Sequence, residues 1–187
     1  MEENSVTPIS DLPEPPQPRS RWAERLVLVL LLGFALFVAM VQGFWVSGDC
    51  MQPGLETGDR LLADKFSYRL HPPQRGDVVI FYYPKDPTQI YVKRIVALPS
   101  ETVEIRNGDV YINQHRLNES YKIYAAHGSM PPRIVPQEQF FVMGDNRDVS
   151  DDSRFWGCLP NRDIIGRAAG RYWPLWGERH PALASRH

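Results

Sequence analysis

The sequence predicts a mainly β domain, antiparallel and barrel-like, preceded by one N-terminal transmembrane helix. Two observations support this prediction. A single apolar run covers residues 26–46, with Gln42 as its only conventionally polar side chain. The chain beyond this run consists of short β-like segments separated by turn residues, without a long amphipathic helical pattern.

Composition narrows the classes of function that the chain can have. Its 187 residues and 43% hydrophobic content suit one ordinary domain with appendages. A formal net charge of -1 argues against a nucleic-acid partner, which would require a clear basic excess. Two cysteines are too few for a structural zinc site, and the five histidines show no metal-ligand spacing. We therefore expect no metal and no cofactor.

Residues 1–25 are predicted to form a disordered cytoplasmic tail. Residues 1–20 contain five prolines and few apolar side chains, so they cannot bury enough surface to offset the entropy of ordering. Three arginines flank the N-terminal side of the apolar run, whereas the first basic residue beyond it is Arg60. The positive-inside rule then puts the tail in the cytoplasm and residues 47–187 on the other side of the membrane.

The apolar run at residues 26–46 is predicted to cross a lipid bilayer. At about 1.5 Å per residue, a helix of this length matches a hydrocarbon core of about 30 Å. Phe44 and Trp45 lie at one end, where aromatic rings favour the membrane interface. A cleavable signal peptide is the alternative. The run is longer than a usual signal-peptide core, however, and no small-x-small cleavage site follows it closely.

The extracytoplasmic part is predicted as one domain over residues 47–175, with a C-terminal tail at 176–187. Asn107-Gly108-Asp109 is a strong hairpin signal between two of its strands. Residues 114–137 lack periodicity and contain three prolines, so they are interpreted as a peripheral excursion. The predicted strands are 60–65, 77–83, 90–97, 102–106, 110–113, 139–143 and 164–172.

The loop at residues 47–55 is the first candidate for chemistry. It contains a Cys-Met pair bracketed by glycines and followed by Pro53, a composition that suits a tight turn presenting one small nucleophilic side chain, Cys50. Taken alone, the same residues equally suit a polar linker between a membrane helix and the domain that follows.

Lys93 is the unusual residue of the strand at 90–97. It shares one face of that strand with Tyr91 and Ile95, whereas Arg94 lies on the other face. If the first face points into the core, burial disfavours the charged amine and makes the lysine a usable general base. The alternative is a solvated lysine on an edge strand.

Residues 144–154 form the third candidate segment, with two arginines among four aspartates. Such a segment builds a loop held by Asx turns and by carboxylate–guanidinium pairs. Its spacing matches no carboxylate metal site. The alternative is a solvated acidic turn.

These segments, in this order and behind an N-terminal anchor, resemble type I signal peptidases, the membrane-bound Ser/Lys proteases of peptidase family S26. The resemblance covers roughly residues 26–173. It depends on four stretches, of which the last two are the most specific: CMQPGLETGDRLLADK, RGDVVIFYYP, YVKRIVALPSE and GDNRDVSDDSRFWG.

The resemblance implies a role for each matching position. Lys93 matches the general base of the family, and Ser150 matches the serine that hydrogen-bonds to that lysine and orients it. Cys50 falls where the family has its nucleophilic serine. Three residues match the ion-paired support of the site: Asp145, Asp152 and Arg154. Asn146 and Arg147 complete the GDNR element and match structural positions.

The loop around Cys50 is implied to form the substrate and oxyanion region, with Gly48, Asp49, Met51 and Pro53 as its members. The loop also departs from the family pattern. Ser-Met-x-Pro-Thr is replaced by Cys50-Met51-Gln52-Pro53-Gly54, and the Gly-Leu-Pro-Gly that follows the lysine is replaced by Ala97-Leu98-Pro99-Ser100.

Three interpretations of Cys50 follow. In the first, the protein is a signal peptidase that uses a Cys/Lys pair to remove signal peptides from exported preproteins at the plasma or inner membrane, or at a thylakoid membrane. In the second, it is an inactive homologue that binds signal sequences or partners. In the third, the cysteine is an engineered substitution. A redox pair of Cys50 with Cys158 is less favoured, because residues 155–159 suit buried apolar packing.

Overall fold

The computed structural model describes residues 21–121 and 128–173. The chain divides into an N-terminal unit, Met1–Phe37, and a second unit, Val38–His187, which carries the strands of the described residues. Helix α1 covers Arg21–Met40. The predicted tails at 1–20 and 176–187 lie outside the described residues. Residues 21–25, predicted as part of the disordered tail, are helical instead.

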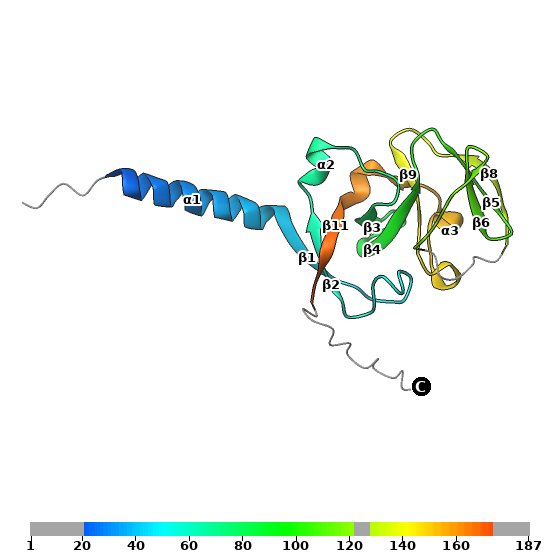
Figure 1. Ribbon diagram of the computed structural model, residues 1–187, viewed down its shortest axis with the longest axis horizontal. Coiled ribbons are helices and arrows are strands. Elements are labelled where there is room, and N and C mark those ends of the chain that lie inside the picture. The colour runs from blue at the N-terminus through cyan, green and yellow to red at the C-terminus, as the bar shows by residue number, and fades with distance from the viewer. Residues whose placement is uncertain (1–20, 122–127, 174–187) are drawn as a thin grey trace, which may run out of the picture. The chain divides into compact units, whose positions relative to one another are not determined.

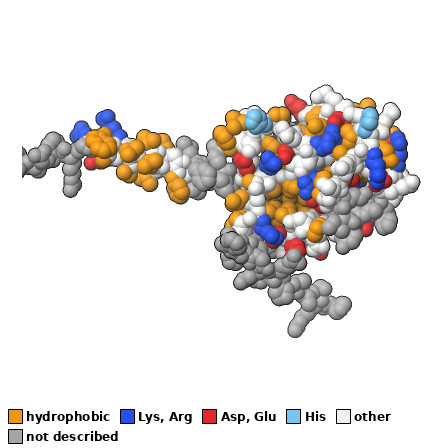
Figure 2. All heavy atoms as spheres, viewed as in Figure 1, with side chains coloured by type: hydrophobic (Ala, Val, Ile, Leu, Met, Phe, Trp, Pro, Cys, Tyr) orange, Lys and Arg blue, Asp and Glu red, His pale blue; other side chains and the backbone are white. Residues whose placement is uncertain are grey.

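Helix α1 exposes apolar side chains (Figure 2). Every residue from Leu26 to Leu32 is a leucine or valine that is more than half exposed. The predicted helix at 26–46 is wrong at its C-terminal end, because residues 41–45 form strand β1. Backbone pairing with a partner strand decides this, since a short apolar run suits helix and strand alike. None of the helices in the described ranges combines the length and apolarity that a membrane crossing requires.

The strands of the second unit form two antiparallel sheets (Figure 1). The seven-stranded sheet has the order β1-β2-β11-β3-β4-β9-β10. Its members are β1 (Val41–Trp45), β2 (Arg60–Asp64), β3 (Val78–Tyr83), β4 (Asp86–Ala97), β9 (Gln139–Met143), β10 (Leu159–Pro160) and β11 (Ile164–Trp173). The mainly β, antiparallel prediction is therefore confirmed, and the strands are arranged in two sheets where a barrel-like domain was predicted.

The smaller sheet has the order β7-β6-β5-β8. It contains β5 (Thr102–Arg106), β6 (Asp109–Ile112), β7 (His115–Arg116) and β8 (Met130–Ile134). The predicted hairpin is confirmed: Arg106 pairs with Asp109, and Asn107 and Gly108 both have positive φ, as a type I′ turn requires. Strands β7 and β8 lie in the stretch predicted as a peripheral excursion, where no strand was predicted. Strand β8 accommodates Pro131 and Pro132 because it is an edge strand.

Short helices complete the domain: α2 (Ser67–Leu70), α3 (Ser153–Trp156), η2 (Arg147–Val149) and η3 (Asn161–Asp163). The core is continuous through β4. Ile95 packs with the aromatic cluster around Phe81, whereas Val96 and Ala97 pack with the smaller sheet. The register of β4 shifts between Ile95 and Ala97, so consecutive residues of this strand pack into both clusters. Strand β4 is thereby fixed from both sides.

Candidate active site

The loop that carries Cys50 is closed at its base by backbone hydrogen bonds. The N–H of Val46 donates to the carbonyl of Asp59 at 2.8 Å, and the N–H of Gly58 donates to the carbonyl of Val46 at 2.9 Å. Met51 is 1% exposed and holds the loop from inside. The buried Met51 side chain and the closed base of the loop fix the backbone that presents Cys50.

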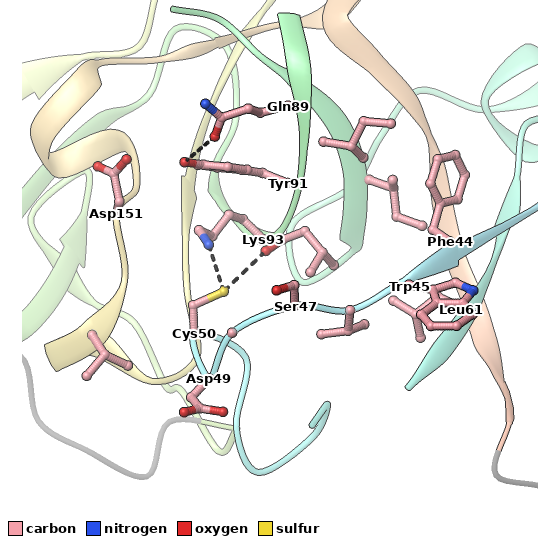
Figure 3. A pocket seen from close by; sticks show the side chains of 16 residues that line it. Phe44, Trp45, Ser47, Asp49, Cys50, Leu61, Gln89, Tyr91, Lys93 and Asp151 are labelled. Carbon is pink, nitrogen blue, oxygen red and sulfur yellow. Dashed lines mark hydrogen bonds between the residues drawn. The ribbon is translucent and has the colours of Figure 1, made fainter. Parts of the chain in front are cut away.

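Cys50 and Lys93 meet across the space between this loop and β4 (Figure 3). The Lys93 Nζ lies 2.8 Å from the Cys50 Sγ, and the Sγ lies 3.9 Å from the carbonyl oxygen of Val92. Lys93 is 3% exposed, on a central strand that pairs with both β3 and β9. Its amine lies 5.3 Å from the centre of the Tyr91 ring. The prediction that Lys93 faces the interior is confirmed, and the solvated edge-strand alternative is wrong.

The Gly144–Asn146 segment packs directly against the backbone of the Cys50 loop. The N–H of Asn146 donates to the carbonyl of Cys50 at 3.0 Å. A Cβ atom at Gly144 would lie 2.5 Å from that same carbonyl oxygen and 2.4 Å from the Oγ of Ser150. Only glycine fits between the two segments, so the loop after β9 sets the position of the cysteine backbone.

Ser150 is buried, but its partner differs from the one that the family resemblance implies. Its Oγ accepts a hydrogen bond from the N–H of Gly144 at 3.2 Å. Among the hydrogen bonds of the described residues, the Lys93 amine donates to Cys50 and not to Ser150. In this structure Ser150 therefore holds the backbone of the loop, and the amine is directed at the thiol.

Asp152 and Arg154 form the predicted ion pair. The Arg154 Nε and Nη2 donate to the two carboxylate oxygens of Asp152 at 2.8 and 2.9 Å. Asp152 is fully buried, accepts the N–H of Gly144 at 3.1 Å and caps helix α3. Arg154 also donates to the carbonyl of Arg147 at 2.6 Å. The pair thus holds both ends of the 144–154 segment.

Asp145 pairs with Arg94, a partner that sequence reasoning missed. Two hydrogen bonds of 2.8 and 2.6 Å join the guanidinium to the carboxylate. Burial alone disfavours the charge on Arg94, but bonding to Asp145 outweighs it and raises the pKa of Arg94. The available sequence signal was the alternation of β4, which sends Arg94 to the face opposite Lys93.

Arg147 is also buried, and its partner Glu119 was missed as well. Its guanidinium bonds both carboxylate oxygens of Glu119 and donates to the carbonyl of Gly144 at 2.9 Å. The Arg147 side chain is 0% exposed and that of Glu119 is 5% exposed. Glu119 lies in the stretch interpreted as peripheral, and no local pattern indicated that it would reach the site.

A pocket of about 500 Å³ opens beside the Cys–Lys pair. Its two ends differ in character, because Phe44, Trp45 and Leu61 lie at one end and Asp151 lies at the other (Figure 3). The predicted substrate residues Gly48 and Asp49 line this pocket. Met51 and Pro53, predicted in the same substrate and oxyanion region, do not line it: Met51 is buried and Pro53 is exposed outside it.

The second cysteine, Cys158, lies apart from the pocket lining and packs half-buried against the core of the smaller sheet. Leu159 is buried as predicted, but Phe155 is 70% exposed, so the prediction of buried apolar packing for 155–159 holds only in part. Within the ranges that the structure covers, no group of three or more His, Cys, Asp or Glu side chains is arranged to hold a metal ion.

Comparison with known proteins gives the family. The chain matches the family model for signal peptidase, peptidase S26, over residues 19–173. A probable signal peptidase I-1 of Synechocystis sp. is 45% identical over 162 residues, covering 82% of this chain and 81% of the relative. Signal peptidase I of Leptolyngbya laminosa is 40% identical over 157 residues, covering 80% and 76%.

A more distant relative is thylakoidal processing peptidase 1 of Arabidopsis thaliana. It is 39% identical over 139 residues, which cover 69% of this chain and 41% of the relative. The chain therefore belongs to the signal peptidase family, peptidase S26. It is an enzyme of the signal peptidase I type, a hydrolase of peptide bonds.

The contribution of the buried Arg147–Glu119 pair to the stability of the site can be tested by mutation. We expect Glu119→Gln to lower the free energy of unfolding by about 3–5 kcal/mol, because the change leaves a buried guanidinium without its counter-charge. Urea unfolding of the full chain, followed by tryptophan fluorescence, measures this loss.

The matched control is Glu104→Gln. Its partner Arg106 is 49% exposed, so water replaces the lost carboxylate and stability stays unchanged. Equal stability of the Glu119→Gln variant and the parent would contradict the supporting role of the buried pair.

Proposed function

We propose that this protein is a membrane-anchored endopeptidase that removes N-terminal signal peptides from exported preproteins, with Cys50 as nucleophile and Lys93 as general base. One observation carries the proposal. The Lys93 Nζ is 2.8 Å from the Cys50 Sγ, at the edge of a pocket, in a chain that belongs to the signal peptidase family. This separation lies within the range for direct proton transfer between a nucleophile and its base.

The chemistry follows from the contact between the two groups. The Cys50 sulfur passes its proton to Lys93, whose Nζ is 2.8 Å away, and attacks the scissile carbonyl. The backbone N–H of Cys50 stabilises the oxyanion of the tetrahedral intermediate. Lys93 then donates its proton to the departing amine, which leaves a thioester on Cys50 that water hydrolyses.

The remaining predicted residues position this pair. Asp152 and Arg154 fix the 144–154 segment, Ser150 holds the backbone of Gly144, and Asp145 pairs with Arg94, the neighbour of Lys93. A site that acts through one short contact depends on such support, since about 1 Å of misplacement costs on the order of a hundredfold in rate.

Signal peptides are the substrate class that best matches the pocket and the chain. The pocket is open, and its apolar end suits small aliphatic side chains of an extended peptide, such as the alanines of an Ala-x-Ala cleavage site. A nucleophile tethered to the membrane meets the end of a membrane-inserted apolar segment more readily than a site in a freely diffusing protein. Gly48 and Asp49 would contact the bound chain.

We further propose that the apolar segment beginning at Leu26 anchors the protein in the plasma or inner membrane, with its N-terminus in the cytoplasm. The exposed apolar row along α1 supports this, as do the arginines that flank its start. One relative is by name a thylakoidal processing peptidase, which makes a thylakoid membrane the alternative location.

The test of anchorage uses the full chain. It remains in the membrane pellet after an alkaline carbonate wash, whereas Leu30→Arg combined with Leu31→Arg releases it. Each charge at the centre of a membrane helix costs about 2.5–3.5 kcal/mol. The matched control combines Leu30→Ala with Leu31→Ala and stays in the pellet. Release of the unmodified chain by the wash would contradict anchorage.

Cleavage of a preprotein with an Ala-x-Ala site tests the catalytic pair. We expect Lys93→Met to lower kcat by about 10²–10⁴-fold, the usual contribution of a general base, because methionine keeps the apolar stem and removes the amine. Cys50→Ala abolishes turnover. Lys85→Met, at an exposed position between β3 and β4, leaves cleavage unchanged. Gel analysis of precursor and mature protein measures all three variants.

The outcomes separate the active enzyme from an inactive homologue. Cleavage by Cys50→Ser but not by the unmodified protein would indicate a lost activity. If Cys50→Ser and Lys93→Ala both leave function in cells intact, the protein acts as a binding module and the enzymatic proposal is wrong.

Alkylation of the full chain with iodoacetamide tests the state of the thiol. Burial raises the pKa of the Cys158 thiol, so less thiolate is present at a given pH and Cys158 reacts only under alkaline conditions. We expect Cys50 to react faster than Cys158 at pH 7. Lys93→Met slows Cys50 and leaves Cys158 unchanged, as mass spectrometry of the two peptides reports. An unchanged Cys50 rate in Lys93→Met would refute the pair.

A further inference from the structure

The residue at the nucleophile position of this chain is a cysteine, and this changes the chemical nature of the acyl intermediate that the site must break down. The inference that follows rests on the proposed function. If Cys50 attacks a peptide bond, the acyl group is held as a thioester and not as an oxygen ester. The two intermediates react differently with the two nucleophiles available to them, water and amines.

The difference lies in which group leaves the tetrahedral intermediate. When an amine attacks an oxygen ester, the amine is a far better leaving group than the strongly basic alkoxide, so the intermediate returns to the ester. When an amine attacks a thioester, the thiolate leaves about as readily as the amine, since thiols ionise near pH 8.5 and departure is faster for the weaker base. The change from ester to thioester favours attack by water less than attack by an amine, because hydroxide leaves more slowly than either the thiolate or the amine.

Transfer to an amine is also the reverse of the acylation step, so the same residues serve it. In acylation Lys93 gives a proton to the departing amine. In the reverse direction the incoming ammonium first loses one proton to water, because only the free amine has a lone pair. Lys93 takes a second proton from the nitrogen as it attacks the thioester carbonyl, and the C–S bond breaks. A new amide forms, Cys50 leaves as thiolate, and Lys93 holds the proton, which restores the pair whose Nζ–Sγ distance is 2.8 Å in this structure. No oxidant or further reactant is required.

The pocket also provides for an amine that arrives in its charged form. Its titratable lining groups are Asp49, Cys50, Tyr91, Lys93 and Asp151. Asp151 is exposed and lies at the end away from the apolar side chains (Figure 3). Burial raises the pKa of Tyr91, and the charge of Asp151 adds to this effect. The field of that carboxylate therefore reaches Tyr91, whose ring lies 5.3 Å from the Lys93 amine.

Asp49 supplies a second carboxylate to the lining of the pocket. It accepts hydrogen bonds from Gln52 at 2.8 Å and from Thr57 at 3.2 Å, so it is held as an acceptor at the loop surface. In the acyl-enzyme Cys50 is a thioester and Lys93 has given its proton to the departed amine, so the charged side chains that line the pocket are the carboxylates of Asp49 and Asp151. A peptide ammonium is attracted to these carboxylates, whereas water gains nothing from them.

We propose that this site is a transpeptidase as well as a hydrolase, transferring the acyl group from Cys50 to the α-amine of an acceptor peptide that enters at the Asp151 end of the pocket. The cleaved chain thereby acquires a new peptide bond at its C-terminal residue. The acceptor is defined by its chemistry, an unhindered primary amine carrying a positive charge.

The experiment uses the full chain in detergent with a synthetic signal peptide that contains an Ala-x-Ala site. Glycinamide is added as acceptor at increasing concentration, and mass spectrometry measures ligated and hydrolysed products. We expect the ratio of ligated to hydrolysed product to rise in proportion to glycinamide. At equal acceptor concentration it is at least about tenfold higher than in Cys50→Ser, because the sulfur leaves as the weaker base.

Asp151→Asn tests the entry of the acceptor. In this variant more glycinamide is needed to reach the same ratio, whereas the ratio with hydroxylamine, which is uncharged at neutral pH, is unchanged. Added salt weakens the preference for glycinamide in the unmodified protein and has no such effect in Asp151→Asn.

The results distinguish the two levels of the proposal. Cleavage that yields only hydrolysed product at every glycinamide concentration, or the same ratio in the unmodified protein and in Cys50→Ser, overturns the transpeptidase inference and leaves the peptidase intact. Absence of any cleavage by the unmodified protein overturns the peptidase proposal, and the transpeptidase inference with it.

Discussion

The contact between the buried amine of Lys93 and the thiol of Cys50 is the interaction on which the rest of this structure depends. A lysine amine at 3% exposure is costly unless a polar partner accepts from it, and the thiol at 2.8 Å is that partner. Strand β4 cannot supply the partner itself, since its neighbours in the sheet are largely apolar. The Cys50 loop must therefore reach over the sheet, and its base is closed by backbone bonds that keep it there.

Two buried networks of ion pairs surround that contact and hold the same backbone segment. One joins Arg94 to Asp145, and the other joins Arg147 to Glu119 and Gly144. Both act on the segment after β9, whose Asn146 N–H holds the carbonyl of Cys50. Such pairs contribute little net stability but penalise any rearrangement that separates the charges. Here they fix a backbone segment, and through it the position of a sulfur atom.

The proposed role of the cysteine links this geometry to chemistry that a serine site would not favour. In the proposed mechanism, the lysine that protonates the amine leaving a peptide bond also deprotonates an amine arriving at a thioester. The pocket has an acidic and an apolar end, and under the proposal these receive the acceptor and the acyl chain respectively. A single atom at position 50 would then decide which nucleophile completes the reaction.

The sequence alone predicted seven of the strands and the Asn107-Gly108 turn, because these depend on alternation and turn chemistry, and the family resemblance supplied the candidate pair. Tertiary pairing decided the rest. Residues 41–45 became a strand because β2 offered them hydrogen-bonding partners, and Pro131 and Pro132 were tolerated because β8 lies at an edge. Glu119 reached Arg147 across 28 positions in the chain, and Ser150 turned to Gly144. Contacts between residues distant in sequence leave no local pattern, so only the folded chain shows them.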